Sequence, residues 1–114
     1  MEMGSKNALA IMDDADLDLA VMHAVKGAFG GSGQKCTASS RIVVHEKIYD
    51  PFVERLIAST QDLVVGQALK TGTQIGPVVS ASQLADNLAW VENGIASGAE
   101  LICAGQRVSR ETEG

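Results

Sequence analysis

The chain has 114 residues and an ordinary globular composition, with 46% hydrophobic and 20% charged residues. Its net charge is −5 and its nine lysines and arginines are scattered, so we expect no nucleic-acid partner. No apolar run approaches the ~20 residues of a membrane span, and the N-terminal stretch lacks a signal-peptide pattern, so no membrane partner is expected. Two cysteines without an export signal predict a reducing compartment, the cytoplasm.

The first part of the chain predicts a strand followed by a helix. Residues 7–13, NALAIMD, form a short apolar run bounded by polar residues, which is typical of a buried strand. From Leu17 to Ala28 the apolar residues recur at helical spacing, and the aspartates just before them are candidate N-caps. A cluster of glycines within 27–33 then predicts that the helix gives way to a loop.

A second strand and a second helix are expected next. Residues 40–48, SRIVVHEKI, are rich in β-branched side chains and predict a strand. The following residues, 49–63, have helical periodicity, with Asp50 as the expected N-cap and Pro51 at the first helical position. A glycine-rich, extended connection follows this helix.

The last third predicts one more helix and one more strand. Ser80 and Gln83 have the spacing of a capping box, and the helix that they open ends near Gly98. Residues 99–105, AELICAG, predict a third short strand. This alternation predicts an α/β fold with a mostly parallel sheet flanked by helices in a three-layer arrangement. Since the tail stops on polar residues without a closing element, we expect a piece of a larger α/β protein.

The stretch GQKCTASSR, residues 33–41, raises the question of what Cys36 does. A lone cysteine is more often a small buried hydrophobe than a catalyst, but no large apolar residue flanks this one. Glycines let the backbone approach a ligand, and a lysine beside a cysteine, here Lys35, favours the thiolate. Backbone N–H groups of such a turn also suit a developing oxyanion. Composition alone leaves Cys36 evenly balanced between core residue and nucleophile.

Other kinds of site find less support. Cys103 lies in an apolar run and is expected in the core, although a disulfide with Cys36 stays open. The cysteines and histidines lack metal-ligand spacing, so no metal site is expected. His23 falls on the polar side of the first helix and His45 at the end of a strand, which gives a Cys–His hydrolase little support. No nucleotide-binding glycine motif is present.

Several segments closely resemble the aldehyde dehydrogenase superfamily. These segments are EMGSKNALAIMDDADLDLAV, GAFGGSGQKCTASSRIVVHEKIYDPFVERL, GPVVS and GAELICAG. The family's usual motif ELGGKNP stands here as EMGSKNA, and its motif GQxCTAxSR stands here as GQKCTASSR. The resemblance runs from Glu2 to about Gly105, and the 34-residue separation of Glu2 and Cys36 is the family's own spacing. Residues 1–114 are therefore identified as part of the family's catalytic domain, without its cofactor-binding domain.

The resemblance implies roles for individual residues. Cys36 matches the nucleophile that attacks the aldehyde to give a thiohemiacetal, and hydride transfer to NAD or NADP then leaves a thioester. Glu2 matches the general base that activates water to hydrolyse this thioester. Lys35 and Thr37 flank the nucleophile, where family members line the substrate pocket.

Departures from the usual motif suggest a substrate. Met3 and Ser5 replace the commoner Leu and Gly, a pattern that resembles the branch acting on α-ketoglutaric semialdehyde. Lys35 is then a candidate partner for a carboxylate on a semialdehyde acid; alternatively it only tunes the thiol or points to solvent.

The resemblance also implies what this chain lacks. Family members carry their cofactor-binding parts outside the matching segment, so we expect this fragment to bind neither NAD nor NADP and to be inactive alone. We expect homo-oligomers, since apolar surface that would pack on missing parts is left exposed. Two other functions stay open: a structural or interaction module without catalysis, and a thiol esterase that uses Cys36 without a cofactor.

Overall fold

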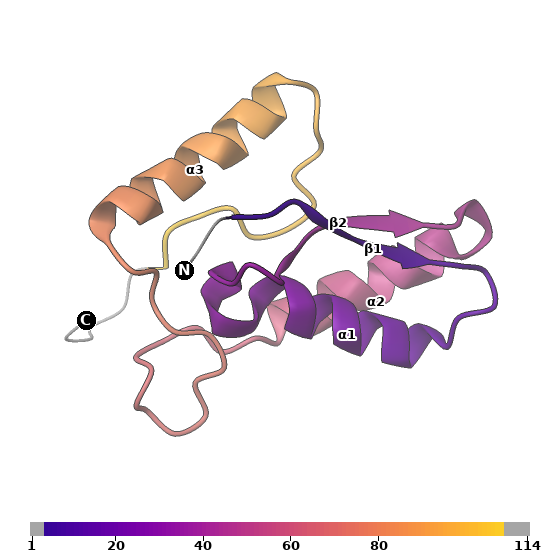
Figure 1. The fold of residues 1–114 in the computed structure, drawn as a ribbon, viewed down its shortest axis with the longest axis horizontal. Coiled ribbons are helices and arrows are strands. Elements are labelled where there is room, and N and C mark those ends of the chain that lie inside the picture. The colour runs from indigo at the N-terminus through magenta and orange to yellow at the C-terminus, as the bar shows by residue number, and fades with distance from the viewer. Residues whose placement is uncertain (1–3, 109–114) are drawn as a thin grey trace. The chain divides into compact units, whose positions relative to one another are not determined.

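The computed structural model describes residues 4–108, which form two compact units divided between Leu63 and Val64 (Figure 1). Unit 1 contains β1 (Asn7–Ile11), α1 (Leu17–Phe29), the 3₁₀ turn η1 (Gly30–Gly33), β2 (Ser39–Val44), the 3₁₀ turn η2 (Glu46–Ile48) and α2 (Tyr49–Gln61). Unit 2 contains α3 (Ala81–Ala96). No helix within residues 4–108 combines the length and apolar character that crossing a bilayer requires.

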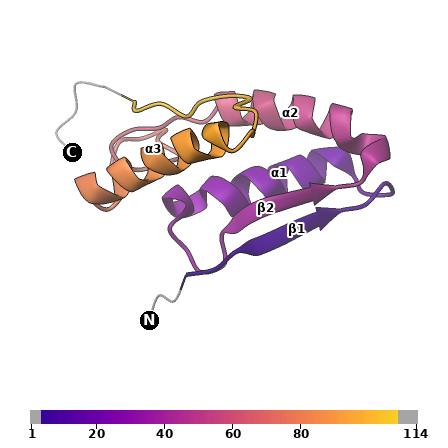
Figure 2. The same ribbon diagram turned by 90° about the horizontal axis from the view of Figure 1, so that it is seen from above.

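Unit 1 is built around a β1–α1–β2 motif with two parallel strands. The strands lie side by side and α1 runs along one side of them (Figure 2). Parallel strands need such a crossover, because a tight turn joins only antiparallel ones. The register is regular from Ala8–Arg41 onward, but Asn7 pairs with Ser39, so the β2 strand has an extra residue, Ser40, at this point. The predicted α/β class with a parallel sheet is confirmed.

One face of this sheet carries the core. The first strand, predicted to be buried, is buried on one face only: Leu9 packs against the core, whereas Ala8 and Ala10 are exposed on the other face. Helices α1 and α2 supply the rest of the core, in which Phe52 is only 1% exposed. The buried side chains are Ile11, Val21, Ala24 and Phe52.

Three predicted boundaries in unit 1 are wrong. The first strand ends at Ile11 instead of 13. The second strand ends at Val44 instead of 48, because the chain turns into η2 there and the Ile48 N–H donates to the His45 carbonyl at 3.1 Å. Asp50 is not the N-cap of α2, since the helix begins at Tyr49 directly from this turn. Its carboxylate instead lies in the first turn, where the helix dipole favours a negative charge.

The predicted helix of unit 2 is confirmed. The Ser80 Oγ accepts a hydrogen bond from the Gln83 N–H at 3.1 Å, which caps α3. The Gln83 side-chain nitrogen donates to Asn87 one turn later, at 2.8 Å, and among the described residues its oxygen accepts no bond from the Ser80 N–H, so the reciprocal bond of a full capping box is not formed. Gly98 follows the helix with φ of +92°, a conformation that suits glycine.

The predicted third strand, 99–105, is wrong. This segment is irregular, and the β-pairing described in unit 2 is a single bridge between Val65 and Ile75. A strand exists only where a neighbour accepts and donates its backbone hydrogen bonds, and no described strand adjoins this segment. The expectation that Cys103 is a core residue is also wrong, because its side chain is only half-buried.

Unit 2 exposes much of its apolar surface. None of its described residues is fully buried, and Trp90 is 73% exposed on α3. Leu69 and Val79 are exposed in the connection before that helix. The expected exposed apolar surface is therefore present, and self-association through it stays a prediction.

Candidate active site

Cys36 lies in a tight turn at the amino end of the β1–β2 pair. The Ala38 N–H donates to the Lys35 carbonyl at 3.0 Å, so Cys36 and Thr37 are the central residues of a β-turn. The side chains of Lys35, Cys36 and Thr37 are all exposed, and the Cys36 thiol is free. This exposure decides against the interpretation of Cys36 as a core residue.

A turn in the left-handed conformation, residues 31–33, lies between α1 and Cys36. Gly31, Ser32 and Gly33 have successive φ values of 62°, 58° and 69°, which end the helical path of α1. Residues that carry a side chain rarely adopt this backbone conformation. In addition, a Cβ on Gly33 would lie 3.0 Å from the Ala28 carbonyl oxygen, a backbone atom that cannot easily move. Glycine at 33 therefore meets a geometric requirement of the turn.

The Lys35 side chain folds back over the same turn. A Cβ on Gly31 would lie 2.7 Å from the Lys35 Cε and 3.5 Å from its Nζ. The lysine stem thus occupies the space that the missing Gly31 side chain leaves. Its ammonium group lies beside the glycine turn, and Cys36 follows Gly33 by three residues in the chain.

Asn7 holds the backbone of Cys36 from the first position of β1. Its Nδ2 donates to the Cys36 carbonyl at 2.6 Å and to the Ala38 carbonyl at 3.3 Å. Its Oδ1 accepts from the Ser5 Oγ at 2.8 Å. Sequence reasoning missed this role of Asn7; the available signal was a polar amide at the start of an otherwise apolar strand.

The N–H groups of the turn point to an oxyanion site. Within residues 4–108, no group accepts a hydrogen bond from the Cys36 N–H or the Thr37 N–H. Donors at the centre of a turn that lack an internal partner suit a negative charge developing beside the thiol. Nucleophile and donors therefore lie within one turn.

Some expected partners of Cys36 lie outside the described residues, and others form no bond with it. Glu2, the expected general base, and Met3 lie outside the described residues. Neither Cys36 nor Cys103 forms a disulfide, so the pairing left open by the sequence is not formed. No group of three metal-ligating side chains gathers among the residues that the structure describes.

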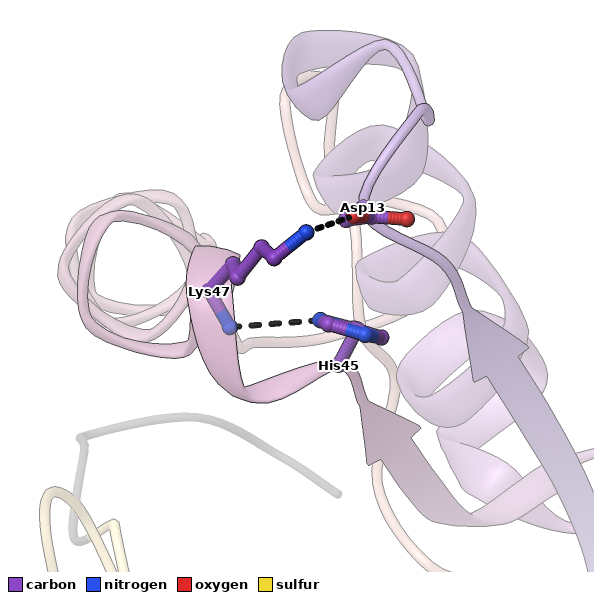
Figure 3. Close-up of polar contacts among 3 residues, drawn as sticks. All are labelled: Asp13, His45 and Lys47. Atoms are coloured by element: carbon purple, nitrogen blue, oxygen red, sulfur yellow. Dashed lines mark hydrogen bonds and ion pairs between the residues drawn. The ribbon is translucent and has the colours of Figure 1, made fainter.

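Among residues 4–108, neither histidine is hydrogen-bonded to Cys36, and His45 lies at the opposite end of β2. His23 is exposed on α1. His45 directly follows the carboxyl end of β2. At a rise of about 3.3 Å per residue, it lies about 20 Å along the strand from Ser39, the first residue of β2. There the His45 Nδ1 accepts from the Lys47 N–H at 3.3 Å (Figure 3). His45 thus shapes the η2 turn and is not placed to serve as a base for Cys36.

An ion pair completes this carboxyl-end cluster of Asp13, His45 and Lys47. The Lys47 Nζ donates to the Asp13 Oδ2 at 2.9 Å, and both side chains reach solvent (Figure 3). The hydrogen bond from Lys47, and then electrostatic attraction by His45, lower the pKa of Asp13 below its usual value.

Comparison with known proteins decides the family. The model of the "Aldehyde dehydrogenase family" matches residues 1–114, the whole chain. The chain belongs to the aldehyde dehydrogenase family. The α-ketoglutaric semialdehyde dehydrogenase of Bacillus subtilis is 42% identical over 108 residues, which cover 95% of this chain and 22% of that enzyme. The betaine aldehyde dehydrogenase of Brucella ovis is 40% identical over 105 residues, which cover 92% of this chain and 22% of that enzyme.

Solved structures of aldehyde dehydrogenases have the same fold over the matching segment. Betaine aldehyde dehydrogenase from Staphylococcus aureus, solved in complex with NAD+, matches with a TM-score of 0.93 and 35% identity. The match covers 96% of this chain and 22% of that one. This aldehyde dehydrogenase chain therefore spans about a fifth of the length of the relatives that it matches, and the family expected from its motifs is confirmed.

Proposed function

We propose that this chain carries the nucleophile of an aldehyde dehydrogenase that oxidises an aldehyde to a carboxylic acid, and that Cys36 is that nucleophile. One observation carries the proposal: an exposed, free thiol stands in a turn whose two central N–H groups, those of Cys36 and Thr37, have no acceptor among residues 4–108. The membership of the whole chain in a family of oxidoreductases supports it.

The proposed reaction begins with the Cys36 thiolate. The sulfur attacks the aldehyde carbon and forms a thiohemiacetal, whose oxyanion the turn N–H groups stabilise. In a full-length protein NAD or NADP would supply the hydride acceptor, and loss of the hydride from the thiohemiacetal carbon would leave a thioester on Cys36. Glu2 then removes a proton from water, which attacks the thioester, releases the acid and restores the thiol. No residue of this chain is assigned to the cofactor, because no nucleotide-binding glycine motif occurs in it.

We further propose that Lys35 and Thr37 contact the substrate and that Lys35 favours a semialdehyde acid. Both side chains are exposed on either side of Cys36. The Lys35 side chain lies over Gly31, so its positive charge stands beside the turn that precedes Cys36, where it can attract a carboxylate. The likeness to an α-ketoglutaric semialdehyde dehydrogenase supports this substrate class.

A segment exchange tests the proposal. Residues 1–114 replace the matching segment of the Bacillus subtilis enzyme, and NADH and NADPH formation are measured with a semialdehyde acid and a neutral aldehyde. We expect turnover that Cys36→Ser abolishes and Cys103→Ser retains. Turnover that survives Cys36→Ser overturns the proposal.

The same exchange tests Lys35. Lys35→Ala is expected to raise KM about tenfold for the semialdehyde acid while leaving KM for the neutral aldehyde unchanged, since one charged contact is lost. Lys70→Ala, an exposed lysine of unit 2, is the matched control. An equal change of KM for both aldehydes would show that Lys35 does not recognise a carboxylate.

A further inference from the structure

We propose that Asn7 is a positioning residue for Cys36: its side-chain amide fixes the peptide that follows the nucleophile and thereby aims the Thr37 N–H as an oxyanion donor. The inference rests on the proposed role of Cys36 and adds a residue to it. It begins from the two hydrogen bonds that the Asn7 amide donates to the Cys36 and Ala38 carbonyls.

The chemistry of the contacts sets the orientation of the amide. Carbonyl oxygens only accept hydrogen bonds, so the Nδ2 of Asn7 must face the Cys36 and Ala38 carbonyls. The Oδ1 faces the Ser5 hydroxyl, which donates to it. Both amide protons and the amide oxygen are therefore used. A flipped amide would place the Asn7 Oδ1 against the carbonyl oxygens of Cys36 and Ala38, which are also acceptors.

The irregular register explains why a side chain makes these bonds. The β1–β2 ladder is interrupted between Asn7 and Ala8, where Ser40 is the extra residue of β2. The Ser40 Oγ donates to the Asn7 carbonyl at 3.4 Å. Beyond this bulge the Asn7 side chain continues the connection from β1 to the turn that contains Cys36.

Fixing one carbonyl fixes the neighbouring donor. In a trans peptide the C=O and N–H groups point in opposite directions, and residues 4–108 contain no cis peptide. The Cys36 carbonyl, held on Asn7, therefore directs the Thr37 N–H to the opposite side of the same peptide plane. A donor stabilises an oxyanion best when its direction is set before the reaction begins.

The test compares two reactions of the same thiol in the 114-residue chain. In acylation by p-nitrophenyl acetate, a C–S bond forms, the C–O bond to nitrophenolate breaks, and an oxyanion develops. In alkylation by iodoacetamide, a C–S bond forms and iodide leaves without an oxyanion. Mass spectrometry of the Cys36 and Cys103 peptides gives both rates, and the acylation-to-alkylation ratio cancels effects on exposure and thiolate content.

We expect Asn7→Ala to lower this ratio at Cys36 about tenfold, the scale of a lost hydrogen bond, and to leave the ratio at Cys103 unchanged. Ser40→Ala, which removes a bond of the same bulge, is the matched control and should leave both ratios unchanged. If Asn7→Ala does not fold, Ser5→Ala takes its place: it removes only the bond that orients the amide and should lower the ratio about twofold to threefold.

The outcomes separate the two proposals. Equal ratios at Cys36 and Cys103 in the unaltered chain overturn the proposed nucleophile, and this inference with it. A higher ratio at Cys36 that falls in Asn7→Ala supports both. A higher ratio at Cys36 that Asn7→Ala and Ser5→Ala both leave unchanged overturns the positioning role alone.

Discussion

The two ends of the β1–β2 pair are held by different kinds of interaction. At the carboxyl end, the Asp13–Lys47 ion pair links two exposed side chains, and such a pair adds little to the free energy of unfolding. At the amino end, Gly33 adopts a backbone geometry that few residues tolerate, and the Asn7 amide bonds the turn around Cys36 through its nitrogen and Ser5 through its oxygen. The end that carries the candidate nucleophile is thus the one whose geometry depends on residue identity.

The largest stability effect is expected from Gly33→Ala. The new Cβ would meet the Ala28 carbonyl oxygen at 3.0 Å in a left-handed conformation, which should lower the free energy of unfolding by about 2 kcal/mol. Gly30→Ala is the matched control, because its φ is −57° and a Cβ there meets nothing within 4 Å. Urea unfolding measures both variants. Equal losses of unfolding free energy in the two variants would show that the left-handed turn does not require glycine at position 33.

A smaller effect is expected at the opposite end of the sheet. Asp16 caps α1 by accepting from the Leu19 N–H at 3.0 Å, so Asp16→Ala should lower the free energy of unfolding by about 1 kcal/mol. Asp14→Ala, two residues earlier and exposed, is the control and should change it little. Because the capped end is remote from Cys36, alkylation of Cys36 by iodoacetamide should keep its rate. A changed rate would contradict the independence of the two ends.

The smallest effect is expected from Lys47→Ala, and it should depend on pH. Folding lowers the pKa of Asp13, so its contribution to stability is fully present above the unfolded pKa and is lost as pH falls through the folded one. Removing Lys47 should raise the pKa of Asp13 toward its usual value, which carboxyl NMR titration measures.

Unfolding measured across pH completes this test. The stability difference between the unaltered chain and Lys47→Ala should be present near neutral pH and disappear in acid, whereas Lys70→Ala should show no such dependence. A difference that persists below the folded pKa of Asp13 would mean that Lys47 acts through packing instead of the ion pair.

Local patterns predicted the elements that local interactions determine. Helices α1 and α3 follow from apolar periodicity and from caps a few residues away, at Asp16 and Ser80. The strand predicted over 99–105 does not form, because a strand needs a neighbouring strand that its own sequence does not specify.

The candidate site was predictable only in part. Glycines and a lysine around Cys36 left this residue balanced between core residue and nucleophile, and the structure shows that the thiol is exposed. The Asn7 contact was missed because it joins residues 29 positions apart, through a bulge that no periodicity signals. The role of Glu2 depends on the family motif and stays a prediction.

The central claim, that Cys36 is the thiol that adds to an aldehyde, is tested most directly by NMR of this chain with a ¹³C-labelled aldehyde. Addition of the thiol across the carbonyl converts the aldehyde carbon into a thiohemiacetal carbon, with no cofactor required. We predict a protein-bound thiohemiacetal signal that Cys103→Ser retains and Cys36→Ser loses. A signal that survives Cys36→Ser, or no protein-bound signal in the unaltered chain, would contradict the account.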